Sequence, residues 1–397
     1  MAKTLARVLL VHDYAGTRGG GELIIQNLRS AFRARGIDAR LMASTADPFD
    51  AASAPDYPFR GSTGRFRGLR EAVNPDAVRV ARRVMRDFAP EVVHLGMILT
   101  QVSPAVLPVV RGRAVLWYLH EFRPVCPNGT RRLPDGRLCD HRVGLACRRE
   151  GCFSGGGLAP RLVQLGLLRH WRRAVDRVIS PSRAFAEILE RHGLAVDAVV
   201  PHGVPAPAAG RPAGGEPVLA FAGRLVPEKG VAVLLDALAL LPPHLAGVRL
   251  WIAGDGPLRG LLEDQARRLD LAGRVDFLGH LPREELQRRF ASVTIQVVPS
   301  VWPEPFGLVT VEAMARGTPV VASAIGAAPE LVDDGRTGYL VPPGDAPALA
   351  RRLAETLGNP SGLGLVAAEA RRTAARDFGL DLMTDRLIAC YRGILDG

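Results

Sequence analysis

The chain has 397 residues, 47% hydrophobic and 23% charged, a composition typical of globular proteins and a length that favours two domains. No apolar run reaches the roughly 18 residues of a membrane span, and the first run stops at His12-Asp13, too early for a secretory signal. We therefore expect a cytoplasmic protein. A formal net charge of +11 favours anionic partners, including lipids at the inner face of a membrane, although an arginine-rich composition alone produces the same balance.

The first half of the chain alternates short apolar runs with helical patterns. Residues 5–12 are expected to form a buried strand, and the glycines at 19–21 precede a helix with an apolar face. Residues 49–74 show no clear period and are predicted as a long surface loop with a short helix inside. Further strands are expected at 92–95, 114–119, 177–180 and 198–201. This alternation indicates a parallel sheet with helices on both faces.

Residues 205–217 contain only small residues, proline, one arginine and one glutamate, which is the composition of a linker. The alternation then restarts. Strands are expected at 218–223, 248–253, 275–279, 294–299 and 319–323, and helices at 346–357, 363–376 and 380–395. We therefore predict an α/β protein with domains at 1–204 and 218–377, a terminal helix in 378–397 that returns to the first domain, and one cleft at the carboxyl ends of both sheets.

The segment GRLVPEKG, residues 223–230, closes the first predicted strand of the second domain. Arg224 would lie at the carboxyl end of that strand, where parallel sheets bind ligands. Lys229 is expected to open the next helix, where the dipole disfavours a cation unless an anion such as a diphosphate is bound. The chain has two lysines, Lys3 and Lys229, so a compact point charge is indicated here. The alternative is an exposed cation in a turn.

The segment WPEPFGLVTVEAMARGTP, residues 302–319, places two carboxylates, Glu304 and Glu312, eight positions apart. Gly307 is expected to begin a helix whose first amides hold a phosphate or a sugar hydroxyl. The helix is almost entirely apolar and should be buried, so a carboxylate inside it needs hydrogen-bond donors, which a bound polyol would supply. The alternatives are a capping Glu304 and a surface Glu312. Paired carboxylates also serve glycoside hydrolysis.

Several stretches resemble the second domain of the retaining glycosyltransferases of family 4, namely GRLVPEKG, IAGDGPLRGLLE, VDFLGHL, PEPFGLVTVEAMARGTPVVAS and DGRTGYLVPPGD. The resemblance is specific over residues 218–344 and looser over the first domain. It implies the GT-B architecture, in which two Rossmann-like domains face a central cleft. Residues 1–204 would then form the acceptor side, and residues 218–377 would bind the donor.

The resemblance also implies a role for each matching residue. Arg224 and Lys229 would grip the donor diphosphate, and Glu304 would bind the hydroxyls of the donor sugar. Glu312 would bind the ribose of the nucleotide. The other positions expected to contact the donor are Gly20, Gly21, Gly223, Gly254, Gly279, Phe306, Gly307, Leu308 and Val309.

His120 follows the strand predicted at 114–119, and in the family a histidine at such a place faces the reacting sugar. A histidine at a strand end is equally often structural. The amides of Gly20 and Gly21 could meet the phosphates or the acceptor. Their loop lacks the regular Gly-x-Gly-x-x-Gly fingerprint of dinucleotide-binding proteins.

The reaction implied by the resemblance moves a sugar from a nucleotide-diphosphate sugar to an acceptor hydroxyl with retention of configuration. No enzyme nucleophile is expected, so catalysis would rest on stabilising the departing diphosphate. Because the chain contains no Asp-x-Asp triplet, we predict no catalytic metal. The acceptor would be a glycan, a lipid-linked saccharide or a small natural product. Gly326-Ala327 replaces a common Gly-Gly pair, and residues 201–205 read PHGVP where Asn-Gly-Val-Asp is usual.

Other classes of protein remain as alternatives. The carboxylate pair together with Arg224 and Lys229 speaks against a GT-B sugar-nucleotide epimerase. A phosphorylase would need a spare lysine for pyridoxal phosphate. A basic phosphate- or lipid-binding protein with a degenerate site is the alternative of a different class, and measured turnover separates it from an enzyme.

Four of the five cysteines fall in a turn-rich segment soon after His120, at Cys126, Cys139, Cys147 and Cys152. Four thiolates would hold zinc tetrahedrally, although the spacing lacks a Cys-x-x-Cys pair. Free thiols and disulfides are the alternatives, the latter disfavoured in the cytosol.

Arginines cluster at 60–70, 79–86 and 161–173, the last group flanking an apolar run. Such clusters would dock on an anionic membrane surface or a phosphorylated acceptor, and a solvated helix face is the plainer interpretation. Nucleic acid is not expected as a partner, because aromatic residues make up only 6% of the chain.

Overall fold

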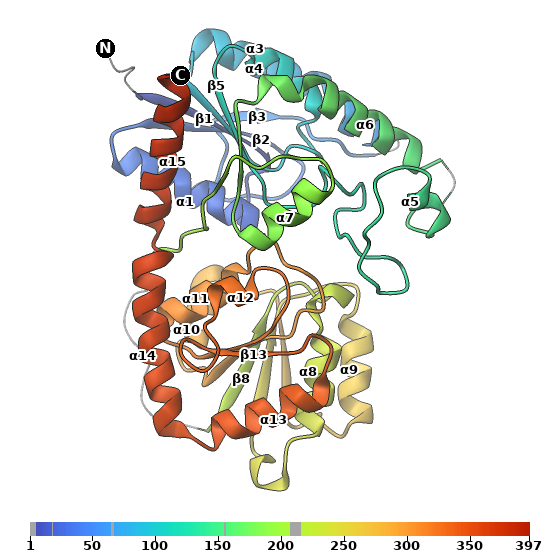
Figure 1. The fold of residues 1–397 in the computed structure, drawn as a ribbon, viewed down its shortest axis with the longest axis vertical. Helices are drawn as coiled ribbons and strands as arrows, with labels where there is room; N and C mark the ends of the chain where they lie inside the picture. Colours follow the sequence, from blue (N-terminus) through green and yellow to red (C-terminus); the bar gives the residue numbers. More distant parts are fainter. Residues whose placement is uncertain (1–4, 18, 65–66, 155, 207–215) are drawn as a thin grey trace. The chain divides into compact units, whose positions relative to one another are not determined.

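The computed structural model describes residues 5–17, 19–64, 67–154, 156–206 and 216–397, which form two compact units. Unit 1 comprises Met1–Gly203 and Leu380–Gly397, and unit 2 comprises Val204–Gly379. Each unit contains one parallel sheet flanked by helices (Figure 1), so the predicted α/β class is confirmed. Most of the predicted linker, residues 207–215, lies outside the described residues.

Unit 1 is built on a seven-stranded sheet in the order β3-β2-β1-β4-β5-β6-β7. Within this sheet, β1 pairs with β2 on one side and with β4 on the other, both in parallel. The central strands are buried on both faces, which explains their continuous apolar runs. The strands are β1 (Arg7–Tyr14), β2 (Asp38–Ser44), β3 (Tyr57–Phe59), β4 (Val92–Leu95), β5 (Ala114–Tyr118), β6 (Arg177–Ser180) and β7 (Ala198–Val199).

Two helices of unit 1, α3 and α7, begin at a residue whose side chain caps the helix. The side chain of Asn74 accepts hydrogen bonds from the amides of Asp76 and Ala77 and caps α3, whose first residue is Pro75. Ser182 caps α7 by accepting from the amide of Phe185. The helices are α1 (Gly20–Ala34), α2 (Arg67–Ala72), α3 (Pro75–Asp87), α4 (Leu107–Val110), α5 (Ala146–Arg149), α6 (Leu158–Trp171), α7 (Arg183–Arg191) and α15 (Leu380–Leu395), with 3-10 turns at Pro104–Val106 and Arg172–Ala174.

Unit 2 contains a six-stranded parallel sheet in the order β10-β9-β8-β11-β12-β13. Counted from the first strand of the unit, this is the order 3-2-1-4-5-6 of a Rossmann sheet. The strands are β8 (Val218–Ala222), β9 (Arg249–Ala253), β10 (Val275–Gly279), β11 (Ile295–Val298), β12 (Val320–Ser323) and β13 (Tyr339–Val341).

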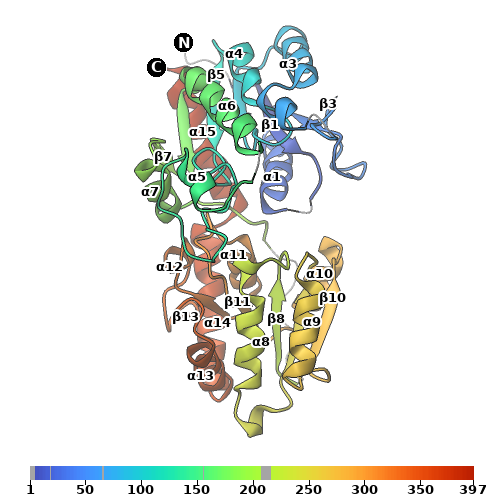
Figure 2. The ribbon, with the colours of Figure 1, turned by 90° about the vertical axis from the view of Figure 1, so that its right-hand side faces the viewer.

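Helices cover both faces of the unit 2 sheet, because alternate side chains of each strand point to opposite faces. Leu219, Phe221 and Ile252 pack with α8 (Val231–Ala239), α9 (Arg259–Arg268) and α13 (Ala346–Leu357). On the other face, β11 and β12 pack with α11 (Leu308–Arg316), α12 (Ala328–Leu331) and α14 (Pro360–Asp377), and Ala220 packs with Phe290 of α10 (Arg283–Phe290). Figure 2 shows α8 and α9 in front of this sheet. Short 3-10 turns lie at Pro227–Lys229 and Pro243–Leu245.

The last two helices belong to different units. α14 ends at Asp377 in unit 2, where the amide of Val204 donates a hydrogen bond to the carbonyl of Phe378 at 2.9 Å. α15 belongs to unit 1, where Arg35, which follows α1, forms ion pairs with Asp381 and Asp385. Among the described residues, no helix is both long enough and apolar enough to cross a membrane.

Three strands with weak sequence patterns were not predicted. β2 was not predicted, and β3 lies inside the segment 49–74 that was interpreted as a loop with one helix. β13 is three residues long and was also missed. β1 runs to Tyr14 rather than ending at residue 12, so His12 and Asp13 are buried strand residues.

Candidate active site

The loops after β8 and β11 leave the unit 2 sheet at the point where its strand order reverses. From β8 the chain proceeds to β9 and β10 on one side, and then returns to β11, β12 and β13 on the other. Connections diverge at such a point and leave a crevice at the carboxyl ends of the strands, where open α/β sheets bind ligands. The predicted residues Arg224 and Lys229 lie in the first loop, and Glu304 lies in the second.

Lys229 and Glu304 contact each other directly. The Lys229 Nζ lies 2.9 Å from Glu304 Oε1, and the side chains are 24% and 12% exposed. The buried hydroxyl of Ser300 donates a further hydrogen bond to the same carboxylate oxygen. Glu304 is thus held in a network of hydrogen bonds rather than capping the helix that follows it. Ser300 was not predicted.

One detail of the prediction for Lys229 is wrong. Lys229 ends the 3-10 turn Pro227–Lys229, and α8 begins only at Val231. The intervening Gly230 has a φ of +66°, and a Cβ there would lie 1.9 Å from the carbonyl oxygen of Pro299. The two loops therefore touch at a position that only glycine can occupy, and this contact brings Lys229 toward Glu304.

Three predicted glycines meet at the carboxyl ends of β8, β9 and β10. The amide of Gly223 donates to the carbonyl of Ala253 at 3.0 Å, and the amide of Gly254 donates to the carbonyl of Gly279 at 2.7 Å. A Cβ at Gly254 would lie 1.8 Å from the carbonyl oxygen of Gly223. Arg224 follows directly and is exposed. The edge of the sheet is therefore formed by backbone at close approach, beside an accessible guanidinium.

In the segment from Phe306 to Val309, Gly307 begins a helix, whereas the side chains of the other residues pack into the core. Gly307 is the N-cap of α11, as predicted, so the first amides of the helix have no partner inside it. The Phe306 side chain, however, is 4% exposed and packs edge-on against Phe378. Its side chain therefore belongs to the core. Leu308 and Val309 are partly buried against the same core.

Gly326 and Ala327 lie against the Glu304 loop. The amide of Ala327 donates to the carbonyl of Glu304 at 3.2 Å. Gly326 has a φ of +61°, and a Cβ there would lie 2.5 Å from the amide nitrogen of Glu304. The segment in which the sequence departs from the family pattern is therefore in backbone contact with a predicted sugar-binding residue.

Glu312 is mostly buried, with 15% of its side chain exposed, so the surface interpretation is wrong. One of the hydrogen-bond donors that this carboxylate needs comes from the protein itself. Arg283, the first residue of α10, donates a hydrogen bond from Nη2 to Glu312 Oε1 at 2.9 Å. Because α10 follows the carboxyl end of β10, this bond places the Glu312 carboxylate at the same edge of the sheet. Arg283 was not predicted.

In unit 1, the buried Asp13 ties the end of β1 to the loop after β4. Its carboxylate accepts hydrogen bonds from the amides of Thr100, Gln101 and Val102 and from the Thr100 hydroxyl, at 2.7–2.9 Å. Gly20 and Gly21 begin α1 as predicted. A Cβ at Gly21 would lie 3.5 Å from His12 Nε2, so the start of α1 lies beside a buried histidine.

His120 lies two residues beyond β5 in a group of aromatic rings. Its Nδ1 lies 3.3 Å from Nε2 of His202, and the two rings stack with centroids 5.0 Å apart. Tyr118 contacts both rings, with centroids at 4.9 Å. Burial lowers the pKa of His120 well below its usual value and that of His202 to about 3. These histidines are neutral at physiological pH and can accept or donate hydrogen bonds without carrying charge.

Glu121, next to His120, has a strongly shifted proton affinity. Burial raises its pKa to about 8, although Arg123 at 3.2 Å opposes the shift. Asp13 and Glu22 raise the pKa further by repulsion. A carboxyl group with a pKa near physiological pH beside a neutral histidine is a candidate proton donor or acceptor.

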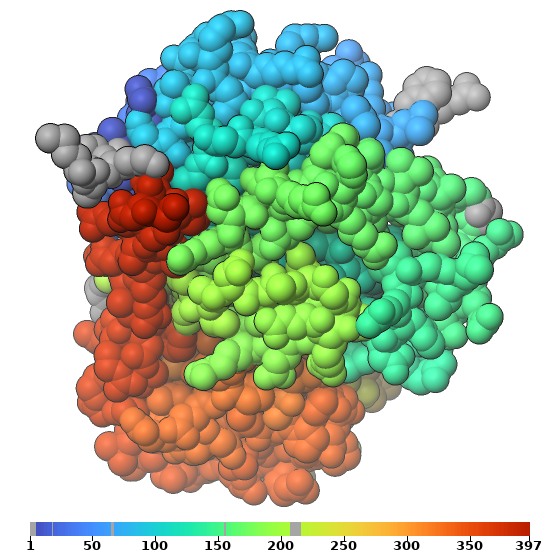
Figure 3. Space-filling model, turned by 45° about the horizontal axis from the view of Figure 1, so that its top comes forward, coloured from blue at the N-terminus to red at the C-terminus, as the bar shows by residue number. Residues whose placement is uncertain are grey.

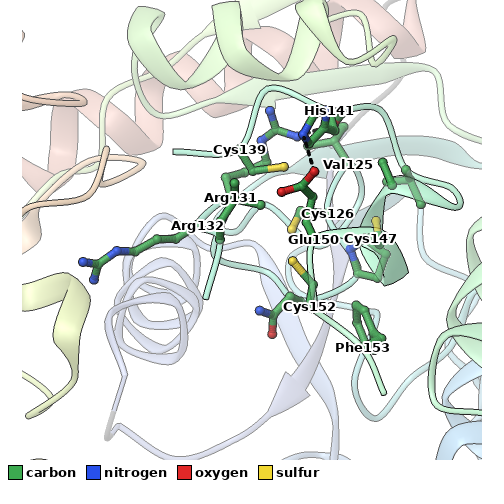
Figure 4. Close-up of a pocket in the computed structure, with 15 residues that line it drawn as sticks. Val125, Cys126, Arg131, Arg132, Cys139, His141, Cys147, Glu150, Cys152 and Phe153 are labelled. Atoms are coloured by element: carbon green, nitrogen blue, oxygen red, sulfur yellow. Dashed lines mark hydrogen bonds and ion pairs between the residues drawn. The ribbon is translucent and has the colours of Figure 1, made fainter. Parts of the chain in front are cut away.

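The four clustered cysteines line one pocket of unit 1, together with Arg131, His141 and Glu150 (Figure 4). They come from a turn, the end of a hairpin, α5 and the loop after it, in a segment whose Leu138 and Leu145 are exposed at the surface. All are free thiols, and burial raises the pKa of Cys139 and Cys152. Within the described ranges, no three His, Cys, Asp or Glu side chains form a group able to hold a metal ion. The predicted zinc site at Cys126, Cys139, Cys147 and Cys152 is therefore not supported.

Part of the predicted basic surface is structural. Arg67 and Arg161 both pair with Glu71, whose side chain is 1% exposed. The Arg67 pair lies within α2, and the Arg161 pair joins α2 to α6. On α6, Leu162 and Val163 are exposed, whereas Leu165 and Leu168 are buried. In Figure 3, the green segments of residues 140–154 and 156–200 lie on the face toward the viewer. Membrane contact stays a prediction.

Two family models match the chain in succession. Residues 18–206 match the model described as Glycosyltransferase Family 4, and residues 206–376 match the model described as Glycosyl transferases group 1. Glycogen synthase of Mycobacterium tuberculosis is 39% identical over 190 residues, 47% of this chain and 46% of that protein. D-inositol 3-phosphate glycosyltransferase of Mycobacterium marinum is 40% identical over 183 residues, 45% of this chain and 38% of that protein. The match thus spans less than half the length of these relatives.

Solved structures share the fold over nearly the whole chain. Sucrose-phosphate synthase from Thermosynechococcus elongatus has a TM-score of 0.75 at 22% identity, covering 98% of this chain and 99% of that one. HepE of Anabaena in complex with UDP and glucose has a TM-score of 0.72 at 22% identity, covering 98% and 100%. The two Rossmann-type sheets and these neighbours define the GT-B class of proteins. With the matches of both family models, the chain belongs to the family 4 glycosyltransferases.

Proposed function

We propose that this protein is a retaining glycosyltransferase, which transfers a sugar from a nucleotide-diphosphate sugar to an acceptor hydroxyl. The observation that carries the proposal is the pairing of Lys229 with Glu304 at the reversal point of the unit 2 sheet. There a cation and a carboxylate occupy the position at which α/β sheets bind ligands. The products would be a glycan, a glycolipid or a glycosylated natural product.

The two charged groups would serve different parts of the donor. When a donor binds, its diphosphate would take Lys229 as a partner, and the exposed Arg224 would add a second cation. Glu304 would then accept hydrogen bonds from hydroxyls of the sugar, held in orientation by Ser300. The amides at the start of α11 would assist by binding an oxygen of the donor.

In the proposed reaction the bond between the anomeric carbon and the diphosphate oxygen breaks, and a bond from that carbon to the acceptor oxygen forms on the same face. The acceptor hydroxyl loses its proton to the departing diphosphate. Lys229 and Arg224 stabilise the negative charge that develops on the leaving group. Such electrostatic stabilisation is usually the largest contribution to lowering the activation barrier. His120, being neutral, would contact the reacting sugar by hydrogen bonding.

A turnover measurement tests the proposal. The protein is incubated with UDP-, GDP- and ADP-sugars and with mixtures of glycan, lipid-linked and small-molecule acceptors, and release of nucleoside diphosphate is measured. We expect release from at least one donor, dependent on acceptor, and a product whose anomeric configuration by NMR equals that of the donor. Inverted product would refute retention. Interconversion of the sugar without transfer would identify an epimerase, and binding without turnover would identify a phosphate-binding protein.

A further inference from the structure

Glu312 receives its hydrogen bond from a residue that the proposed function does not use. Arg283 Nη2 donates to Glu312 Oε1 at 2.9 Å, and the two side chains are 33% and 15% exposed. Among the described residues, none donates a hydrogen bond to the second oxygen, Oε2. The carboxylate is thus fixed through one oxygen and leaves the other for a ligand.

The position of Arg283 is unfavourable for its own helix. It is the first residue of α10, where the helix dipole disfavours a cation, and the next two residues, Glu284 and Glu285, follow the usual preference for acidic residues. The ion pair with Glu312, 29 positions along the chain, compensates this cost. Because the pair is partly shielded from water, its charge-assisted hydrogen bond is stronger than one at the surface.

A second arginine lies near the Glu312 side chain and interacts with its charge. Arg316 lies one turn further along α11, and its guanidinium is largely buried, 5.9 Å from the centre of the Phe290 ring of α10. Burial lowers the pKa of Arg316, and the charge of Glu312 opposes that shift. Glu312 therefore faces cations from both α10 and α11, and of these only Arg283 is within hydrogen-bond distance.

We infer that Arg283 is a positioning residue, which holds the Glu312 carboxylate so that Oε2 accepts hydrogen bonds from the ribose hydroxyls of the nucleotide donor. The inference rests on the proposed function, because it requires a ribonucleotide at this edge. Arg283 acts through Glu312 and not on the diphosphate. Its effect is therefore restricted to ligands that carry ribose hydroxyls.

The test compares a ribonucleotide with its analogue lacking both hydroxyls. Calorimetry first identifies the tightest binder among UDP, GDP, ADP and CDP, and its 2′,3′-dideoxy form is then titrated in parallel. We expect Arg283→Ala to weaken the ribonucleotide about tenfold, the usual loss for one charge-assisted hydrogen bond, and to leave the dideoxy analogue unchanged. Arg283→Lys, which keeps a donor and a charge, should recover most of the affinity.

A double-mutant comparison separates the two proposals. Glu312→Gln should weaken the ribonucleotide on its own, and Arg283→Ala should add nothing in the Glu312→Gln background. Arg288→Ala, an exposed arginine of the same helix, is the control and should not change the affinity. If Arg283→Ala leaves ribonucleotide binding unchanged, tightens it, or weakens both nucleotides equally, the inference is overturned. If none of the four nucleotides binds, or Glu312→Gln has no effect, the proposed donor site itself fails.

Discussion

At the residue scale, Glu304 contacts three other residues of the candidate site. Its carboxylate accepts from Ser300 and pairs with Lys229, while its backbone carbonyl accepts from Ala327. If a donor diphosphate draws Lys229 away, as we propose, Ser300 is the partner that remains on the same oxygen. The buried serine is therefore expected to keep Glu304 in place during turnover.

Replacing this serine gives a prediction on the transfer rate. Ser300→Ala should lower kcat/KM about tenfold, because one hydrogen bond to the Glu304 carboxylate is lost while the fold is kept. Initial rates of nucleoside diphosphate release measure the effect. The control is Ser292→Ala, which replaces an exposed serine that precedes β11. An activity equal to that of the wild type would show that Lys229 and the backbone suffice to hold Glu304.

Glu121 gives a prediction on pH dependence. Its pKa is raised to about 8 in the fold, above the value of an unfolded glutamate, so the folded protein holds its proton more tightly. The stabilisation is complete at acidic pH and is lost as the pH rises through about 8. Glutamine stays neutral throughout, so the melting temperature of Glu121→Gln relative to the wild type should rise from pH 5 to pH 8. Glu187→Gln, exposed on α7, should show no such trend, and a constant difference for Glu121→Gln would contradict the shift.

The residues that sequence reasoning found are those whose chemistry is unusual for their place in the chain. Lys229 is one of two lysines, and Glu304 and Glu312 interrupt an apolar segment. Ser300 and Arg283 carry no such mark, since serines after strands and arginines at helix starts are common in this chain. Their roles depend on contacts across loops, which periodicity along one segment does not show.

At the element scale, the carboxyl edge of the unit 2 sheet depends on backbone approach. A Cβ atom at position 254 would lie 1.8 Å from the carbonyl oxygen of Gly223. Because this neighbour is a backbone atom, a small movement of a side chain cannot make room for it. The loops after β8 and β9 are joined further, since the amide of Leu225 donates to the carbonyl of Asp255 at 3.0 Å. The edge is thus fixed without help from side chains.

A pair of glycine substitutions tests this arrangement. Gly254→Ala should lower the free energy of unfolding by about 3 kcal/mol, because the edge must open to admit the methyl group. Gly260→Ala, in α9 with open space around it, should instead stabilise by about 0.5–1 kcal/mol. Thermal or urea unfolding measures both. Equal stability of the two variants would mean that the edge is looser than the structure indicates.

The elements that could be predicted are those with strong local patterns. β4, β6, β10, α13 and α15 lie at the predicted residues, because each combines a clear apolar period with marked ends. β2 and β3 lie in sequences in which arginine, proline and aspartate dilute the apolar pattern. β2 pairs with β1, and β3 pairs with β2. This pairing is tertiary context that a local pattern does not contain.

At the scale of the whole molecule, both units contain strands in the Rossmann order 3-2-1-4-5-6, and unit 1 adds a seventh strand after them. The two family models are matched in succession along the chain. Most of the site residues that could be predicted from the sequence lie in unit 2, because the motifs there are long and specific. In unit 1 the sequence pointed to His120 and the glycine loop. It did not show that His202, from the end of the unit, stacks on His120.

The central claim is that unit 2 binds a nucleoside diphosphate group through Lys229. It is tested most directly by the melting temperature of the wild type and of Lys229→Ala over increasing concentrations of UDP, GDP and ADP. A ligand that binds the folded state stabilises it by about 2.7 kcal/mol at a hundred times its Kd. We predict that at least one nucleotide raises the melting temperature of the wild type, and that the variant needs a far higher concentration for the same rise. The account would be contradicted if no nucleotide shifts the wild type, or if both proteins respond alike.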